Sequence, residues 1–307
     1  MLIGNLFSLA IAAQISSPST EAARRERLTE ADLERRMKLM ADLERSAIQR
    51  SQQTKEPVAR EPVINKETKD RILIQRRIRV SDAAPYAELL KSESAGIIKI
   101  FPSMNCLSST VIRVDAECAS YVPMSSDFSF RNRGYIDHFY EDIGYTDGVF
   151  SNRAFFTQAA FVELGDVPLR VELSADPKVL ALAKVADKDV TIDDAKLTAA
   201  QLKATMEIDA VPVSSQVVPE LGKTYGLRVI AYRFSGSVPP VTAKSSLIEL
   251  RFLSLNADKR DDLTLVFRIL SKDENGGLTI VWQELRRAAA PKLKLGKGQP
   301  LSDFRLL

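Results

Sequence analysis

Residues 263–285 read LTLVFRILSKDENGGLTIVWQEL, and this stretch carries the clearest structural signal in the chain. Two runs of alternating apolar residues, 263–270 and 278–285, flank a polar segment that contains Asn275 and Gly276. An Asn-Gly pair between alternating runs is the strongest local signal for a β-hairpin. Alternate residues of a strand share one face. The hairpin is therefore expected to present one apolar face made of Leu263, Leu265, Phe267, Ile269, Leu278, Ile280 and Trp282.

Outside this hairpin, runs of β-branched and aromatic residues indicate further strands. These runs are 96–101, 109–114, 155–164, 169–173, 225–234 and 246–255. Residues 176–206 favour helix instead, since Asp176-Pro177 can begin one helix and the Ala-rich residues 198–204 can form another. We therefore expect one α+β domain over residues 80–290, with a mostly antiparallel sheet and this helical insertion. A β-sandwich-like body made of two packed sheets is the alternative architecture.

The first 13 residues, MLIGNLFSLAIAA, form a short apolar segment that ends in small residues. This pattern is typical of a secretory signal peptide, and it is much shorter than the roughly 20 residues of a membrane-spanning helix. No Lys or Arg precedes Arg24, so the basic start of a usual signal peptide is missing. A buried or frayed apolar N-terminus is the alternative. We expect residues 1–13 to be a signal peptide and the protein to be periplasmic or secreted, without a transmembrane span in the mature chain.

Residues 20–53 lack Gly and Pro and are rich in helix-forming residues, which predicts a long charged N-terminal helix. Its apolar residues recur every three or four positions and form a narrow stripe. The stripe consists of Leu33, Met37, Met40, Leu43 and Ala47. Such a helix could form a coiled coil, rest on anionic lipid or simply be solvated. Residues 54–79 contain two prolines and are expected to be a linker, and the Lys-rich residues 291–307 are expected to be a flexible tail.

The composition limits the chemistry that the chain can perform. It has 43 Lys and Arg residues against 40 Asp and Glu residues, and the basic excess lies before residue 80. The body is therefore close to neutral, which argues against a nucleic-acid-binding face on it. One His and two Cys are too few for an ordinary zinc site, which takes about four ligands mostly of these types. The sequence contains no glycine-rich phosphate loop and no hydrolase motif, so we expect neither a metal nor a cofactor.

Cys106 and Cys118 are the two cysteines of the chain. In an exported protein, an isolated pair of this kind predicts a disulfide. Closing a loop of this size contributes about 3 kcal/mol to stability in the chain-entropy treatment. Two free thiols are the alternative for a chain that stays in the cytosol.

The segment 128–148 combines aromatic and acidic side chains and is the place where chemistry is most plausible. Within it, Asp137, His138, Glu141 and Asp142 are weak candidates for the general acid and base of a hydrolase that acts on sugars. Its aromatic side chains could also stack on a sugar or a peptide. Nothing in the segment defines a nucleophile or an oxyanion hole, so an ordinary sheet edge with paired carboxylates is the simpler interpretation.

Several segments resemble a group of uncharacterised exported proteins of soil-type bacteria. They are FSFR at 128–131, LGDVPL at 164–169, and the pair TYGLRVIAY at 224–232 and DLTLVFR at 262–268. The resemblance covers roughly residues 96–292. It implies a bacterial cell-envelope protein and carries no catalytic signature, so it implies no activity.

The leading functional hypothesis is a non-catalytic cell-envelope protein that binds a partner protein or a surface, with residues 20–53 as the binding element. The first alternative is a carboxylate-dependent hydrolase acting on sugars, centred on residues 137–147. The second alternative is nucleic-acid binding through the basic N-terminal arm. In addition, Arg286 and Arg287 could contact phosphate or acidic lipid together with the Lys-rich tail.

Overall fold

A computed structural model describes residues 66–104, 106–108, 111–112, 118, 121–136, 138–186, 189–235 and 258–294. The expected signal peptide, the helix at 20–53, the strand at 246–255 and the end of the tail lie outside these residues. The described part is built mostly from antiparallel strands, as the sequence predicts. None of its helices has the length and apolar character needed to span a bilayer.

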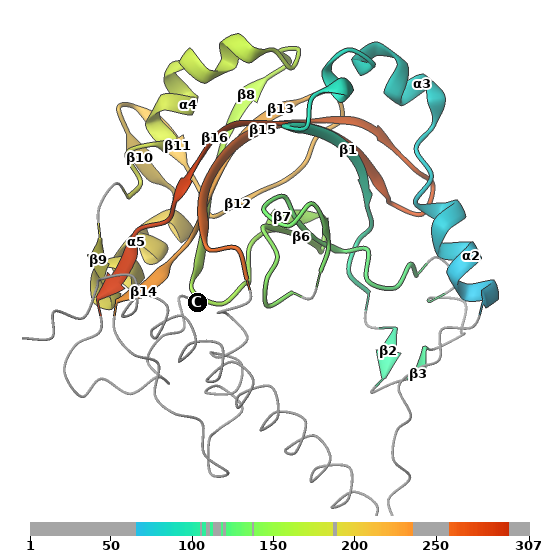
Figure 1. Cartoon of the computed structure of the whole chain (residues 1–307), viewed down its shortest axis with the longest axis horizontal. Coiled ribbons are helices and arrows are strands. Elements are labelled where there is room, and N and C mark those ends of the chain that lie inside the picture. Colours follow the sequence, from blue (N-terminus) through green and yellow to red (C-terminus); the bar gives the residue numbers. More distant parts are fainter. Residues whose placement is uncertain are drawn as a thin grey trace, which may run out of the picture. The chain divides into compact units, whose positions relative to one another are not determined.

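The main element is a five-stranded sheet in which every neighbouring pair is antiparallel. In order across the sheet, its strands are β1 (Ala95–Ile100), β16 (Leu278–Ala289), β15 (Asp261–Lys272), β13 (Thr224–Ala231) and β8 (Thr157–Gly165). The predicted hairpin is confirmed: β15 pairs with β16, and Phe267 lies opposite Trp282. At its turn Gly276 has a positive φ of 80°, a conformation that glycine adopts at no steric cost. The sheet is strongly arched (Figure 1).

A second, smaller sheet lies under the arch (Figure 1). In order, its strands are β12 (Gln216–Val217), β7 (Val149–Ser151), β6 (Ile143–Thr146), β4 (Asp127–Ser129) and β5 (Gly134–Tyr135). The predicted apolar face of the hairpin is buried against it, together with Phe128, Phe130, Ile143 and Phe150. Edge-to-face aromatic pairs join the two layers, with ring centroids 5.4 Å apart for Phe130 and Trp282 and 5.9 Å apart for Phe150 and Phe267. The two sheets therefore form a sandwich, the architecture that the sequence left as the alternative.

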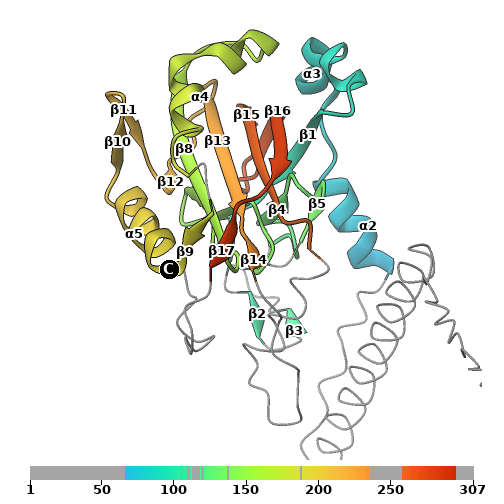
Figure 2. The same ribbon diagram turned by 60° about the vertical axis from the view of Figure 1, so that its left-hand side comes forward.

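Helices cover the opposite face of the large sheet (Figure 2). The segment 176–206 contains two of them, α4 (Pro177–Leu182) and α5 (Ile192–Lys203), where the sequence predicts helix. The side chain of Asp176 caps α4, and a capping box of Thr191 and Asp194 begins α5. Gly226 lets α4 approach the sheet, since a Cβ atom there would lie 3.1 Å from Leu182 Cδ1. After α5 the chain forms a hairpin of β10 (Met206–Ile208) and β11 (Val211–Val213).

Three strands at one end of the molecule depart from the antiparallel rule. They are β14 (Arg233–Ser235), β17 (Lys292–Lys294) and β9 (Val190–Thr191), which pair in parallel. β17 belongs to the segment that the sequence predicts to be a flexible tail. This prediction is wrong for residues 292–294, because Leu293 is fully buried in the core beneath the helices.

Two other segments differ from the expectation. Residues 54–79 are expected to be a linker, yet α2 (Lys66–Gln75) lies inside them, and its Ile72 packs against Phe101 and Val122. Residues 169–173 alternate like a strand, yet the chain forms the 3-10 helix η4 (Val171–Ala175), in which the Leu173 N–H donates to the Arg170 carbonyl. The strand prediction for 169–173 is wrong because a period of two over so short a stretch is equally compatible with one turn of helix.

The remaining short elements lie before β4. They are α3 (Val80–Ala83), η1 (Ala84–Tyr86), η2 (Leu89–Lys91), β2 (Leu107–Ser108) and β3 (Val111–Ile112). β2 and β3 pair as antiparallel strands. Cys106 and Cys118 form the predicted disulfide, with their Cα atoms 5.6 Å apart.

Replacing Trp282 or Phe267 by Ala should lower the free energy of unfolding by about 3–5 kcal/mol, because each change leaves a cavity between the two sheets. Leu197→Ala on α5 is the matched control, since this side chain is 60% exposed and should change stability by less than about 0.5 kcal/mol. Urea denaturation of the three variants measures the differences. Near-native stability of both aromatic variants would contradict the placement of the hairpin in the core.

Candidate functional site

Of the four residues that the sequence nominates for catalysis, the structure describes His138, Glu141 and Asp142. Asp137 lies outside the described residues. His138 is exposed, and its ring centroid lies 3.8 Å from that of Phe139. Glu141 and Asp142 directly precede β6 and are fully buried. The structure thus places the imidazole at the surface and the two carboxylates in the interior.

Asp142 serves as the counter-ion of Arg131, which follows β4 and is also fully buried. The Asp142 carboxylate accepts hydrogen bonds from the Arg131 side chain, from the Arg131 backbone N–H at 2.8 Å and from the Ser129 hydroxyl at 3.1 Å. Three donors therefore satisfy a carboxylate that has no access to solvent.

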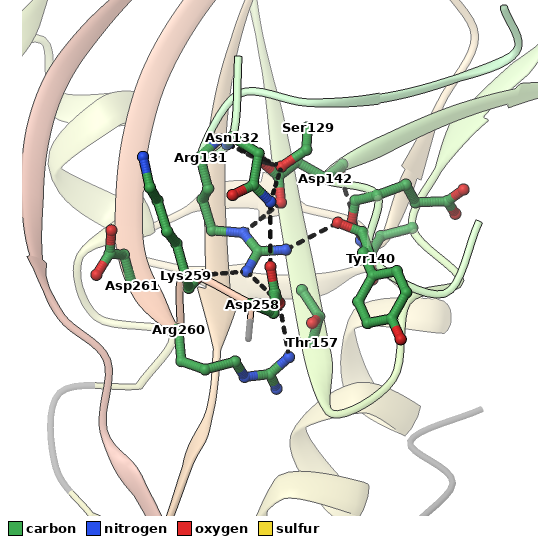
Figure 3. A network of polar contacts seen from close by, with 12 residues as sticks. Ser129, Arg131, Asn132, Tyr140, Asp142, Thr157, Asp258, Lys259, Arg260 and Asp261 are labelled. Atoms are coloured by element: carbon green, nitrogen blue, oxygen red, sulfur yellow. Dashed lines mark hydrogen bonds and ion pairs between the residues drawn. The ribbon is translucent and has the colours of Figure 1, made fainter. Parts of the chain in front are cut away.

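Asp258 and the chain around it supply the other partners of the Arg131 guanidinium. Asp258 forms an ion pair with it at 2.8 Å, and the carbonyls of Lys259 and Tyr140 accept its remaining N–H groups. Arg260 lies 3.1 Å from Asp258 and donates to the carbonyls of Phe155, Phe156 and Tyr232. Figure 3 shows this cluster of two arginines and two aspartates. We call it the Arg131 network, with Arg131, Asp142, Asp258 and Arg260 as its members.

The electrostatics of the Arg131 network are those of a buried, neutralised cluster. Burial alone would lower the pKa of Arg131, but Asp142 and Asp258 raise it above its ordinary value. Burial, with the neighbouring charge of Arg131, lowers the pKa of Arg260 to about 10, so both guanidinium groups remain charged at neutral pH. The network joins the small sheet to residues 258–260, which lead directly into β15. Its ion pairs and hydrogen bonds hold the small sheet against the large sheet.

Glu141 belongs to a second cluster, formed with Asp127 and Arg153. The Arg153 backbone N–H donates to Glu141 Oε1 at 2.7 Å, and the Arg153 guanidinium lies 2.9 Å from Asp127 Oδ1. The carboxyl groups of Asp127 and Glu141 are close enough to affect each other's pKa. Gly144 makes room for them, because a Cβ atom there would lie 3.0 Å from Asp127 Oδ1 and 3.1 Å from both carboxyl oxygens of Glu141.

The two carboxyl groups of this cluster are in opposite protonation states. Burial, followed by the hydrogen bond and charge of Asp127, raises the pKa of Glu141 to about 10. Partial burial alone would raise the pKa of Asp127, but hydrogen bonds from Glu141 and Ser126 outweigh it and lower that pKa. Glu141 Oε2 is buried and has no hydrogen-bond partner among the described residues. At neutral pH Glu141 is therefore protonated and Asp127 is ionised.

This arrangement does not suit glycoside hydrolysis. The two carboxyl groups of glycosidases stand about 5 Å or more apart, with the glycosidic bond between them. Asp127 and Glu141 instead both pack against Gly144, and the Glu141 side chain is 0% exposed. In the described part of the chain, no three His, Cys, Asp or Glu side chains are grouped as metal ligands would be.

Sequence reasoning identified Glu141 and Asp142 by residue type but missed their partners. Asp258 lies 127 residues from Arg131, so no local pattern connects them. One signal was available: Arg131 follows Phe128 and Phe130 at the end of an alternating apolar run, where a charge must be paired if it is buried. No known protein family, no characterised protein and no solved structure matches this chain.

Glu141→Gln should make the stability of the protein less dependent on pH. The pKa of Glu141 is about 10 in the folded protein against an ordinary value of 4.5. Between pH 4.5 and pH 10 the Glu141 side chain therefore keeps its proton in the folded state and has lost it in the unfolded state. The stability from this proton is complete below pH 4.5 and is lost as the pH rises towards 10.

The free energy of unfolding should fall between pH 5 and pH 9 by at least about 1 kcal/mol more in the wild type than in the Gln variant. Urea denaturation at both pH values measures this difference. Glu207→Gln, at an exposed position on β10, is the matched control and should retain the wild-type pH dependence. The same pH dependence in the wild type and in Glu141→Gln would show that Glu141 is ionised in the folded protein.

Proposed function

We propose that this chain is an exported, non-catalytic protein of the cell envelope that binds a partner protein or a surface. The proposal rests on the surroundings of Glu141 and Asp142, the two described carboxyl groups that the sequence nominates for catalysis. Asp142 neutralises Arg131, Glu141 accepts a hydrogen bond from the Arg153 backbone N–H, and both nominated side chains are fully buried. Groups held in this way stabilise the fold and cannot reach a substrate without unfolding it.

The proposed location rests on three separate features. The Cys106–Cys118 disulfide is of a kind that persists in oxidising compartments and is rare in the cytosol. Residues 1–13 have the pattern of a signal peptide. The resemblance of residues 96–292 to exported proteins of soil-type bacteria points the same way.

The proposed binding element is the apolar stripe of residues 20–53. On a helix, its members would form a strip too narrow for burial in a core and flanked by charge. A strip of this kind fits a partner helix or the headgroup region of a membrane. The disulfide-bonded body would then act as the exported domain that this arm tethers.

Replacing Leu33, Met37 and Met40 by Ser in the full chain should abolish capture of a partner from the protein's own cell envelope, because the change removes the apolar stripe. Glu34, Lys38 and Asp42, replaced by Ser in the same segment, are the matched control and should leave capture intact. A tagged pull-down followed by identification of the captured protein or lipid measures the effect. Equal capture by both variants would show that residues 20–53 are only a spacer.

The same tagged protein and cell-envelope preparations are used to test for hydrolysis. Reducing-sugar release from envelope polysaccharides should stay at the level of the blank for the wild type. Polysaccharide cleavage that is lost in Glu141→Gln would overturn the non-catalytic proposal and favour the hydrolase. Capture of DNA or RNA in place of protein or lipid would favour the nucleic-acid alternative.

A further inference from the structure

A pocket of about 340 Å³ lies where the large sheet meets the parallel strands β14, β17 and β9. Three arginines and two aspartates line it: Arg228, Arg233, Arg286, Asp189 and Asp262. We call it the arginine pocket. None of these residues belongs to the Arg131 network or to the Glu141 cluster.

Strand register explains how three of these side chains come together. Arg228 on β13 lies opposite Thr264 on β15, and Thr264 lies opposite Arg286 on β16. Paired residues share a face of the sheet, and so do residues two positions apart on one strand. Asp262 therefore lies on the same face as both arginines, the face that α4 covers.

Arg228 and Asp262 neutralise each other and form one wall of the arginine pocket. The Arg228 guanidinium donates to both carboxylate oxygens of Asp262, at 2.8 Å and 2.7 Å. Its other N–H groups donate to the carbonyls of Leu182, Ala183 and Ala186. The side chain is only 1% exposed, so it has no donor left for a ligand.

Arg286 and Arg233 are not neutralised in this way. Arg286 is 53% exposed, and its one ion pair among the described residues is a 3.4 Å contact with Asp262, whose carboxylate Arg228 already occupies. Arg233 donates its Nε–H to the Ala290 carbonyl at 2.6 Å. Its two Nη groups have no hydrogen-bond partner among the described residues. The other carboxylate of the pocket, Asp189, accepts a hydrogen bond from the Lys292 backbone N–H at 2.8 Å. The three arginines still outnumber the two aspartates, and Arg233 keeps guanidinium donors that have no partner among the described residues.

A second pocket shows that this charge is particular to the arginine pocket. It has a volume of about 430 Å³, and its charged lining consists of Arg170, Glu172 and Asp176. Its formal charge is negative, whereas that of the arginine pocket is positive. An anion is thus attracted to the arginine pocket and repelled by the second pocket.

We propose that the arginine pocket binds a phosphate-type oxyanion, held between Arg233 and Arg286. The planar fork of a guanidinium matches the paired oxygens of phosphate and gives strong, charge-assisted hydrogen bonds. The volume falls within the range of small-molecule sites and leaves room for an organic group attached to the phosphate. Arg287, which the sequence grouped with Arg286, lies in another environment and is bound to Asp261 and Glu284.

The phosphate could belong to a free phosphoester or to a lipid headgroup, since both present the same oxygens. The inference is independent of the proposed function, because it depends only on residues of the body. An effect of the stripe in residues 20–53 on partner capture would neither support nor oppose it.

Isothermal titration of the full mature chain with inorganic phosphate and with glycerol 3-phosphate tests the inference. Saturable binding is expected, tighter for glycerol 3-phosphate because the pocket is larger than phosphate. Arg233→Gln and Arg286→Gln should each weaken binding by about tenfold, and the double variant should abolish it. Arg170→Gln in the acidic pocket is the matched control and should bind like the wild type.

Near-UV circular dichroism confirms folding of each variant. Arg286→Gln alone keeps the test decisive if the double variant does not fold, because this side chain is half-exposed. Absence of binding by the wild type, or unchanged affinity in Arg286→Gln, would overturn the proposal. Unchanged affinity in a folded double variant would overturn it equally.

Vesicle sedimentation separates the two sources of phosphate. Phosphatidylcholine vesicles with and without phosphatidic acid are compared, using the wild type and Arg286→Gln. Wild-type binding that requires phosphatidic acid and is weakened in the variant identifies a lipid headgroup. Binding of glycerol 3-phosphate without vesicle binding identifies a free phosphoester. Vesicle binding that Arg286→Gln does not weaken would exclude the arginine pocket as the lipid site.

Discussion

Two arginines buried in the interior impose the constraint on which the structure depends. Arg131 at the end of β4 and Arg228 on β13 are both almost without solvent access, and an unpaired charge in such a place costs several kcal/mol. Each must therefore have a carboxylate and several carbonyls around it. Asp142, Asp258 and the Tyr140 carbonyl meet this need for Arg131. Asp262 and the carbonyls around the end of α4 meet it for Arg228. These demands fix where the small sheet and α4 lie against the large sheet.

The need to neutralise the buried arginines divides the charged side chains into two groups: those that stabilise the fold and those that can bind a ligand. Carboxyl groups that neutralise buried arginines, or that bind Arg153 as Glu141 and Asp127 do, stabilise the fold. In the arginine pocket, Arg233, Arg286 and Asp189 lie beside a pair that is already neutral, which leaves an excess of positive charge. The region where the sequence suggested acid–base chemistry thus holds the layers together. The sequence suggested phosphate contact at Arg286 and Arg287. Arg287 is paired with Asp261 and Glu284, whereas Arg286 has only a 3.4 Å contact with Asp262 among the described residues.

The parts of the fold that sequence reasoning identified are those with local signals. The hairpin of β15 and β16 has an Asn-Gly turn between alternating runs, and the Cys pair encloses a short segment. The departures concern contacts between distant residues. Leu293 is buried because β17 pairs with β14 and β9, which lie far away along the chain. Asp258 was invisible as a partner of Arg131 for the same reason. Residue type alone could point to Glu141 and Asp142, but only the pairing shows that they are structural.

The ion pair between Arg131, which follows β4, and Asp258, which precedes β15, holds the small sheet against the large sheet. A double-mutant cycle tests this role most directly, with Arg131→Met, Asp258→Asn and the combined variant compared by urea denaturation at neutral pH. Each single change should lower the free energy of unfolding by about 3–5 kcal/mol, because it leaves one buried charge without its partner. The combined change should cost clearly less than the sum of the two. Additive losses, or single variants within about 0.5 kcal/mol of the wild type, would contradict the claim.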